Sequence, residues 1–115
     1  MTAQPLQLWF RLDGPQGAIG PGKVRLLRAV QEEGSLSAAA RKAGLSYRRA
    51  WQLVDEASRA VGHRLVETSQ GGRGGGGARL TSAGEAVVCE FQHLETVLAA
   101  AAEPALRRLA DLGGD

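Results

Sequence analysis

The residues best suited to chemistry in this sequence form one short polar and basic stretch that begins at Ser46. Tyr47, Arg48 and Arg49 follow directly, and Gln52 lies about one helical turn further along. Arginine can pair with two acceptors of guanine and glutamine with adenine, so this set predicts reading of base edges in duplex DNA. We expect Arg48 to be the strongest reader. Arg49 lies partly to the side of the helix face that would read DNA, so base contact and exposure to solvent are equal alternatives for it.

Two short helices joined by a tight turn are needed to present this stretch. Ser35 can cap the first helix and Ser46 the second, because a serine oxygen accepts a hydrogen bond from a free amide one turn ahead. The small residues 38–40 allow a close helix crossing, and Gly44 suits the positive φ of a helix end. The pattern predicts a helix-turn-helix whose second helix enters a major groove. The buried stripe of that helix is expected to contain Ala50, Leu53, Val54, Ala57 and Val61.

Contacts with the DNA backbone are expected from polar and basic residues around this motif. Ser35 and Ser37 lie at the start of the first helix, Lys42 lies near its end, and Arg73 lies in a glycine-rich loop. Such contacts set the affinity and its salt dependence, because each neutralised phosphate releases counterions. Trp51 falls between the two faces of the second helix, where packing in the core and contact with a ligand both remain open.

A hairpin and a helix are predicted before the motif. Residues 6–12 alternate largely between apolar and polar types and predict a strand, which a turn at 13–17 joins to a short partner strand at 18–19. A helix is expected over residues 23–33, with Gly34 as its stop. We expect Leu26 near the edge of its apolar face, which contains Val24, Leu27, Ala29 and Val30.

A second hairpin is predicted after the motif. Strands at 64–68 and 77–81 flank residues 70–77, which include six glycines and Arg73. A hairpin directly after a helix-turn-helix is a wing, although a plain flexible turn remains the alternative. A nucleotide-binding loop would end in Gly-Lys-Ser or Gly-Lys-Thr and open a helix, and neither feature is present.

A long helix is predicted to follow, capped by Thr81 or Ser82. Pro104 predicts a kink or a restart, with a short terminal helix over 105–112. The surplus apolar surface favours dimerisation, while packing back onto the same domain remains open. We therefore expect residues 1–81 to bind DNA and residues 82–115 to dimerise, within one continuous domain. The apolar stripe comprises Val87, Val88, Phe91, Leu94, Val97, Leu98 and Ala101.

The charge distribution favours a polyanionic partner for the middle of the chain. Residues 23–79 contain 11 basic and 5 acidic side chains, a net charge of +6, whereas residues 80–115 have a net charge of −4. An unevenly charged but merely solvated surface is the alternative. That alternative is weaker because the positive charge falls on a helix-turn-helix.

Other functional classes have little support. No apolar run is long enough for a membrane span, and the single Cys89 excludes an internal disulfide and fits a reducing cytoplasm. His63 and His93 have no evident nucleophile or acid partner, and two histidines with one cysteine give no metal-ligand spacing. We expect no enzyme activity, no cofactor and no metal.

Several separated motifs together resemble the N-terminal DNA-binding domain of the molybdate-responsive ModE regulators, a relative of the LysR-type winged helix. The motifs are residues 34–40, 46–51, 71–78 and 80–84, and the resemblance spans roughly residues 6–100. It implies that the helix from Ser46 reads DNA, that the glycine hairpin is the wing and that the helix from Ser82 supports a dimer. It also suggests molybdenum-related target genes.

The complete regulators of that family also have C-terminal molybdate-binding domains. The 115 residues leave no room for such domains, so molybdate binding by this chain is doubtful. We expect a single-domain member of the family, with an excised fragment of a longer regulator as the alternative. The predicted fold class is mainly α with small β-hairpins, a winged helix-turn-helix with a long C-terminal dimerisation helix. The predicted function is a homodimeric, sequence-specific transcription regulator that binds double-stranded DNA. The alternative is a protein-interaction or architectural DNA-binding module without a specific operator.

Overall fold

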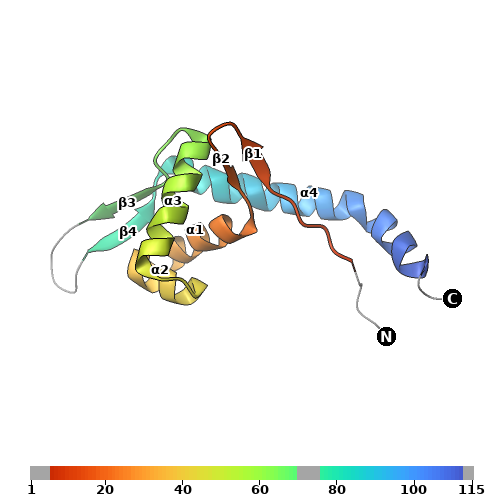
Figure 1. The fold of residues 1–115 in the computed structure, drawn as a ribbon, viewed down its shortest axis with the longest axis horizontal. Helices are drawn as coiled ribbons and strands as arrows, with labels where there is room; N and C mark the ends of the chain where they lie inside the picture. The colour runs from red at the N-terminus through yellow and green to blue at the C-terminus, as the bar shows by residue number, and fades with distance from the viewer. Residues whose placement is uncertain (1–5, 70–75, 113–115) are drawn as a thin grey trace.

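The computed structural model describes residues 6–69 and 76–112, which form four helices and two antiparallel hairpins (Figure 1). This order confirms the predicted winged helix-turn-helix with a long C-terminal helix. The elements are β1 (Leu12–Gly14), β2 (Gly17–Ile19), α1 (Pro21–Glu33), α2 (Leu36–Ala43), α3 (Tyr47–Val61), β3 (Val66–Ser69), β4 (Gly77–Leu80) and α4 (Ser82–Leu112).

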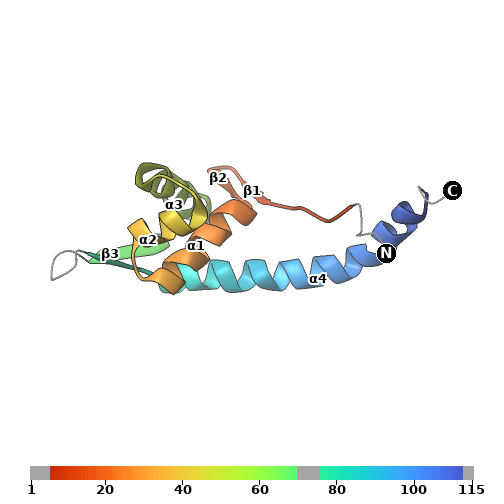
Figure 2. The ribbon, with the colours of Figure 1, turned by 90° about the horizontal axis from the view of Figure 1, so that it is seen from below.

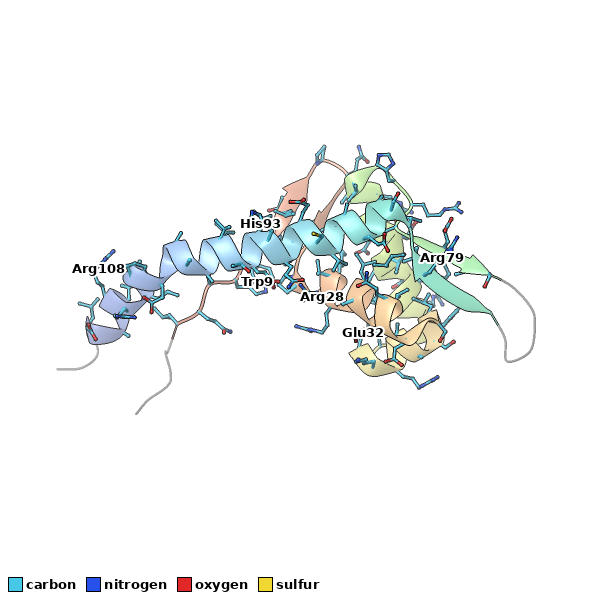
Figure 3. The ribbon with its side chains drawn as sticks, turned by 180° about the vertical axis from the view of Figure 1, so that it is seen from behind. Trp9, Arg28, Glu32, Arg79, His93 and Arg108 are labelled. Carbon is cyan, nitrogen blue, oxygen red and sulfur yellow. The ribbon has the colours of Figure 1, made fainter. Side chains whose placement is uncertain are left out.

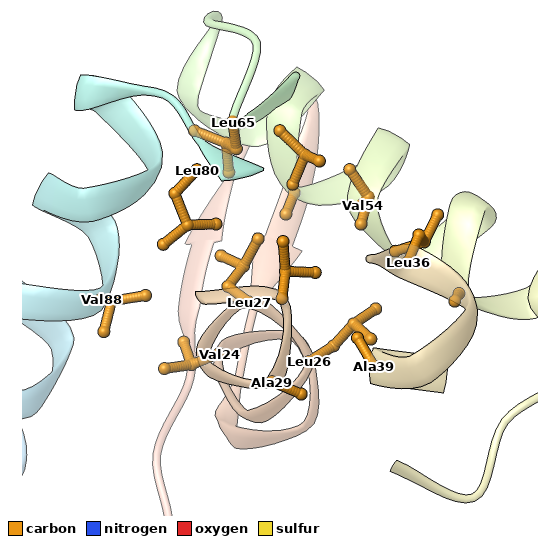
Figure 4. Packing of buried hydrophobic residues seen from close by; sticks show 14 of the residues in the cluster. Val24, Leu26, Leu27, Ala29, Leu36, Ala39, Val54, Leu65, Leu80 and Val88 are labelled. Atoms are coloured by element: carbon orange, nitrogen blue, oxygen red, sulfur yellow. The ribbon is translucent and has the colours of Figure 1, made fainter. Parts of the chain in front are cut away.

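Helix α1 is the centre of the core because α2, α3 and α4 all pack against it. It begins at Pro21, two residues before the predicted start, since proline is well suited to a first helical turn. Leu26 was expected near the edge but is only 1% exposed. Figure 4 shows Leu26 beside Ala39 of α2. Because other helices pack against α1 on several sides, α1 buries a wider face than the single apolar stripe predicted from the sequence.

Helix α3 buries most of its predicted stripe. Ala50, Val54 and Ala57 are buried and Leu53 is half-buried. Val61, which was expected in this stripe, is 38% exposed. It is the last residue of α3, immediately before the left-handed Gly62 that ends the helix, and it lies beyond the packed part of the stripe.

The N-terminal hairpin is shorter than predicted. Residues 6–11 form no strand, and pairing starts only at Leu12, opposite Ile19. Residues 6–11 have no strand to pair with, because β2 is only three residues long and pairs only with the three residues of β1. The hairpin lies close to α3, since a Cβ on Gly17 would be 3.2 Å from the carbonyl oxygen of Glu56.

The second hairpin confirms the predicted wing strands with slightly different bounds. Its register pairs Val66 with Leu80 and Ser69 with Gly77. The backbone amide of Ala78 donates to the carbonyl oxygen of Gly34 at 2.8 Å. The wing is therefore fixed to the start of the helix-turn-helix by a backbone hydrogen bond.

Helix α4 is capped by Thr81, one of the two predicted candidates. The Thr81 hydroxyl oxygen accepts from the amide of Gly84 at 3.0 Å and donates to the carbonyl oxygen of Arg64 at 2.6 Å. Ser82 is instead the first residue of the helix. One threonine thereby fixes the helix start and joins it to the segment before β3.

Helix α4 continues without a break past Pro104, so the predicted restart as a separate helix is wrong. Its last turns bend away from the rest of the helix (Figure 2), as expected when a proline removes an internal hydrogen bond. Its buried residues are Gly84, Val88 and Phe91, all in its first three turns. The remainder projects from the core and gives the molecule its length of 62 Å.

Candidate nucleic-acid interface

The two serine caps that define the motif are present. The Ser35 hydroxyl oxygen accepts from the Ala38 amide at 3.1 Å, and that of Ser46 accepts from the Arg49 amide at 3.0 Å. Gly44 ends α2 with a φ of 73° in the left-handed region, as predicted. A capping serine still has its own O–H to donate, so both hydroxyls can also bind an acceptor such as a phosphate oxygen.

The predicted base-reading residues share one exposed surface at the start of α3. Tyr47, Arg48, Arg49 and Gln52 are all exposed, while Ala50 points into the core. The guanidinium of Arg49 donates to the side-chain oxygen of Gln52 at 3.1 Å. Two of the five predicted readers, which also include the exposed Ser46, are thus linked by a hydrogen bond that orients their polar groups together.

A groove separates this surface from the wing. Its volume is about 290 Å³, and its walls come from the start of α2, the start of α3 and the strands β3 and β4. The predicted contact residues Ser35, Ser37 and Tyr47 lie together along it. Thr68 and Ser69 add two hydroxyls from the wing side.

Thr68, Ser69 and Trp51 are the groove residues that sequence reasoning did not assign to the site. A usable signal existed for the first two, because Thr68 is the polar last residue of the strand predicted over 64–68 and Ser69 follows it just before the glycine loop. Trp51 is half-buried and packs against the core, and its ring meets that of Tyr47 edge-on at 6.5 Å between centroids. Trp51 therefore has a packing role and also lines the groove.

Lys42 and Arg73 are placed differently from the other predicted contacts. The Lys42 ammonium lies 2.6 Å from a carboxylate oxygen of Glu32 and 3.5 Å from one of Glu33. The hydrogen bond that Lys42 donates to Glu32 is the main reason that the pKa of Lys42 is raised, and the negative charges of Glu32 and Glu33 act in the same direction. Arg73 lies outside the described residues.

In the described part of the basic segment, the cations without an ion pair are spread over α1, α2, α3 and the residues before β3, and two of them, Arg48 and Arg49, are neighbours at the start of α3. Four further cations of the basic segment have carboxylate partners: Lys23 with Glu56, Arg28 with Glu95, Arg59 with Asp55 and Arg79 with Glu67. Arg28 and Arg79 are labelled in Figure 3. Within residues 6–69 and 76–112, Arg25, Arg41, Arg48, Arg49 and Arg64 form no ion pair.

The part of the chain that the structure describes contains no cluster of three or more potential metal ligands. Its helices also include none that is both long and apolar enough to span a membrane.

Comparison with known proteins gives several related sequences. A "Molybdenum transport protein ModE" of Azotobacter vinelandii is 36% identical over 117 residues, which cover all of this chain and 43% of that protein. The "Molybdenum-pterin-binding protein MopA" of Rhodobacter capsulatus is 42% identical over 70% of this chain and 30% of its own length. The "DNA-binding transcriptional dual regulator ModE" of Escherichia coli is 41% identical over 59% of this chain and 26% of its own length.

The chain thus spans less than half the length of each of these relatives. The family model for bacterial regulatory helix-turn-helix proteins of the lysR family matches residues 22–85. That segment runs from the first turn of α1, through the helix-turn-helix and the wing, into the first turn of α4. The chain belongs to the lysR family of bacterial regulatory helix-turn-helix proteins.

Proposed function

We propose that this chain is a transcription regulator that binds double-stranded DNA at specific sequences. The observation that carries the proposal is the surface at the capped start of α3, where Arg48 and Arg49 are exposed and form no ion pair among the described residues. Such a surface is suited to acceptors in the major groove. The chain would act by binding and not by catalysis.

Two kinds of contact follow from the placement of the side chains. Arg48, Arg49, Gln52 and Tyr47 read base edges, with Ser46 at the edge of the same surface. The hydroxyls along the groove bind phosphates of the strand that passes between α3 and the wing. They belong to Ser35, Ser37, Thr68 and Ser69. Arg73 supplies a further phosphate contact, whereas Lys42 supplies one only when it is released from Glu32 and Glu33.

We also propose a homodimer, which the shape of α4 supports. Residues 1–81 form the DNA-binding part, while residues 82–115 pair with those of a second copy. The support is that α4 continues far beyond the core and has no buried residue after Phe91. Regulators with a helix-turn-helix commonly bind two half-sites as two-fold dimers, which requires such a second surface.

The target genes are proposed to be related to molybdenum. The support comes from the names of the relatives, which are called molybdenum transport, molybdenum-pterin-binding and transcriptional regulator proteins. Those names describe proteins more than twice as long, so the proposal concerns the genes regulated and not molybdate binding by these 115 residues.

The test is selection of bound duplexes from a random pool, followed by fluorescence-anisotropy titration of the selected site at several salt concentrations. We expect tight binding to one palindromic sequence, with an affinity that falls steeply with salt and does not change with molybdate. Arg48→Ala/Arg49→Ala should abolish specific binding. Arg59→Ala is the matched control, because Arg59 lies on the same helix but is paired with Asp55.

The alternative function is a module that binds other proteins or binds DNA without a specific operator. The observation in its favour is the unpartnered outer part of α4 with its apolar side chains. Binding to every duplex with equal affinity would indicate an architectural role. Absence of binding at low salt would overturn the DNA proposal altogether.

A further inference from the structure

The arm, which we define as residues 6–12, exposes an unusual amount of apolar surface. Leu6, Leu8 and Leu12 are 43–45% exposed, and Trp9 is 63% exposed. A large aromatic side chain in solvent is the informative exception in a folded protein, because its burial is strongly favourable. Several exposed apolar side chains within one short segment are typical of an interaction surface.

The arm is anchored to the domain. Phe10 stacks on Phe91 of α4, with ring centroids 4.7 Å apart and an interplanar angle of 17°. The indole of Trp9 lies over Gly20, where an added Cβ would be 3.6 Å from its Cζ2 atom. Phe10 thus holds the arm, while the neighbouring apolar side chains remain open to solvent.

Helix α4 has a matching apolar surface that its own chain covers only in part, because Leu94, Leu98, Ala102 and Leu106 are half-buried and Leu109 is 48% exposed. Beyond Phe91 none of its residues is buried, although apolar residues recur at three- and four-residue intervals. In both views the arm and the last turns of α4 extend toward the same end of the molecule (Figures 1 and 2). An isolated helical extension is only marginally stable in water, so this stripe requires a partner. The stripe comprises Leu94, Leu98, Ala102, Leu106 and Leu109.

We propose that the arm docks on α4 of a second copy of this chain, so that two arms and two α4 helices form one two-fold interface. This inference rests on the dimer of the proposed function, and it adds the arm to the residues that form the dimer interface. In a two-fold dimer every contact occurs twice. When the two α4 stripes pair across the axis, each arm, which extends in the same direction as its own α4, lies beside the partner's α4.

The areas agree with this assignment. The four exposed arm side chains offer on the order of 400 Å² of apolar surface, whereas a stable interface buries about 800 Å² on each partner. The arm alone is therefore too small for a stable interface. The α4 stripe supplies the remainder, and this is why the arm needs a second copy that presents the same helix.

The first test measures the dimer dissociation constant of the full chain by sedimentation equilibrium. Trp9→Ser should raise this constant at least tenfold. Val61→Ser is the matched control, because Val61 is a partly exposed apolar residue outside both the arm and α4, and it should leave the constant within twofold. Circular dichroism checks that both variants are folded. An unchanged constant for Trp9→Ser would overturn the role of the arm while leaving the dimer in place.

The second test is spectroscopic. The chain has two tryptophans, so Trp51→Phe leaves Trp9 as the only one. Its emission should shift to shorter wavelength as the protein concentration rises through the dimer dissociation constant. A dimer whose Trp9 emission stays at its monomer wavelength contradicts the proposal. If the chain is monomeric at every concentration, both the dimer and the arm contact are contradicted. The proposal that the chain recognises DNA is tested separately, by measuring its binding to single half-sites.

Discussion

At the scale of single residues, Arg48 and Lys42 show that neighbouring carboxylates decide whether a cation is available to bind DNA. Both are exposed and both belong to the basic middle of the sequence. Lys42 is held between two carboxylates of α1, whereas Arg48 has no ion pair among the described residues. Exposed ion pairs contribute little to stability, but they reduce the charge that a phosphate or a base meets.

Arg48→Ala should relax specificity at one base pair. We expect the preferred duplex to lose about 1–3 kcal/mol of binding free energy, while duplexes already substituted at that base pair lose much less. Anisotropy titrations against single-base-pair variants of the selected site measure the difference. An equal loss on every duplex would identify Arg48 as a phosphate contact instead.

Removing the carboxylates beside Lys42 should release a phosphate contact. In Glu32→Gln/Glu33→Gln, the slope of log affinity against log salt concentration should steepen by about 0.9, the value for one additional neutralised phosphate. Adding Lys42→Ala in the same background should restore the original slope. If the slope does not change in the first variant, Lys42 does not reach DNA.

At the scale of elements, close backbone contacts fix the angle at which α4 leaves the domain. The Thr81 hydroxyl joins the helix start to Arg64, and Gly84 lies directly against the carbonyl oxygen of Leu65. Since α4 is the proposed dimer helix, this junction sets how two DNA-binding surfaces are oriented relative to each other.

Gly84→Ala should therefore destabilise the fold. Its new Cβ collides with the Leu65 carbonyl oxygen, which belongs to backbone and cannot rotate away, so the free energy of unfolding should fall by about 1–3 kcal/mol. Gly22→Ala is the control, because nothing lies within 4 Å of its added Cβ. That change should be neutral or stabilising by up to about 1 kcal/mol. Urea unfolding compares them, and equal stability of the two variants would contradict the close-approach argument.

At the scale of the whole molecule, the proposed dimer would determine which DNA sites can be bound. Two helix-turn-helix motifs related by a two-fold axis fit half-sites separated by about one helical turn of DNA, or a multiple of it. Inserting about half a turn, roughly 5 base pairs, between the half-sites should reduce the affinity to that of one half-site. Anisotropy titrations with the lengthened duplex measure this, and tight binding that is independent of spacing would contradict a rigid dimer.

Local signals in the sequence were sufficient to predict most of the elements. Ser35, Gly44 and Ser46 act through hydrogen bonds and φ angles within a few residues, and their predicted roles as caps and turn are confirmed. The wing strands and the Thr81 cap depend on equally local patterns. Fold class and helix-turn-helix could thus be predicted because these interactions involve neighbours in the sequence.

Tertiary structure alone decided the features that depend on distant residues. Leu26 is buried because α2 packs against α1, residues 6–11 form no strand because β2 is too short, and the ion pairs of Lys42 join two helices. The groove likewise forms only where α2, α3 and the wing meet. The sequence marks Thr68 as the polar end of a strand, but only the packing places Thr68 and Tyr47 along the same groove. The sequence by itself determined the elements and the polar face of α3, and the packing of segments far apart along the chain determined which charges remain free and which surfaces remain uncovered.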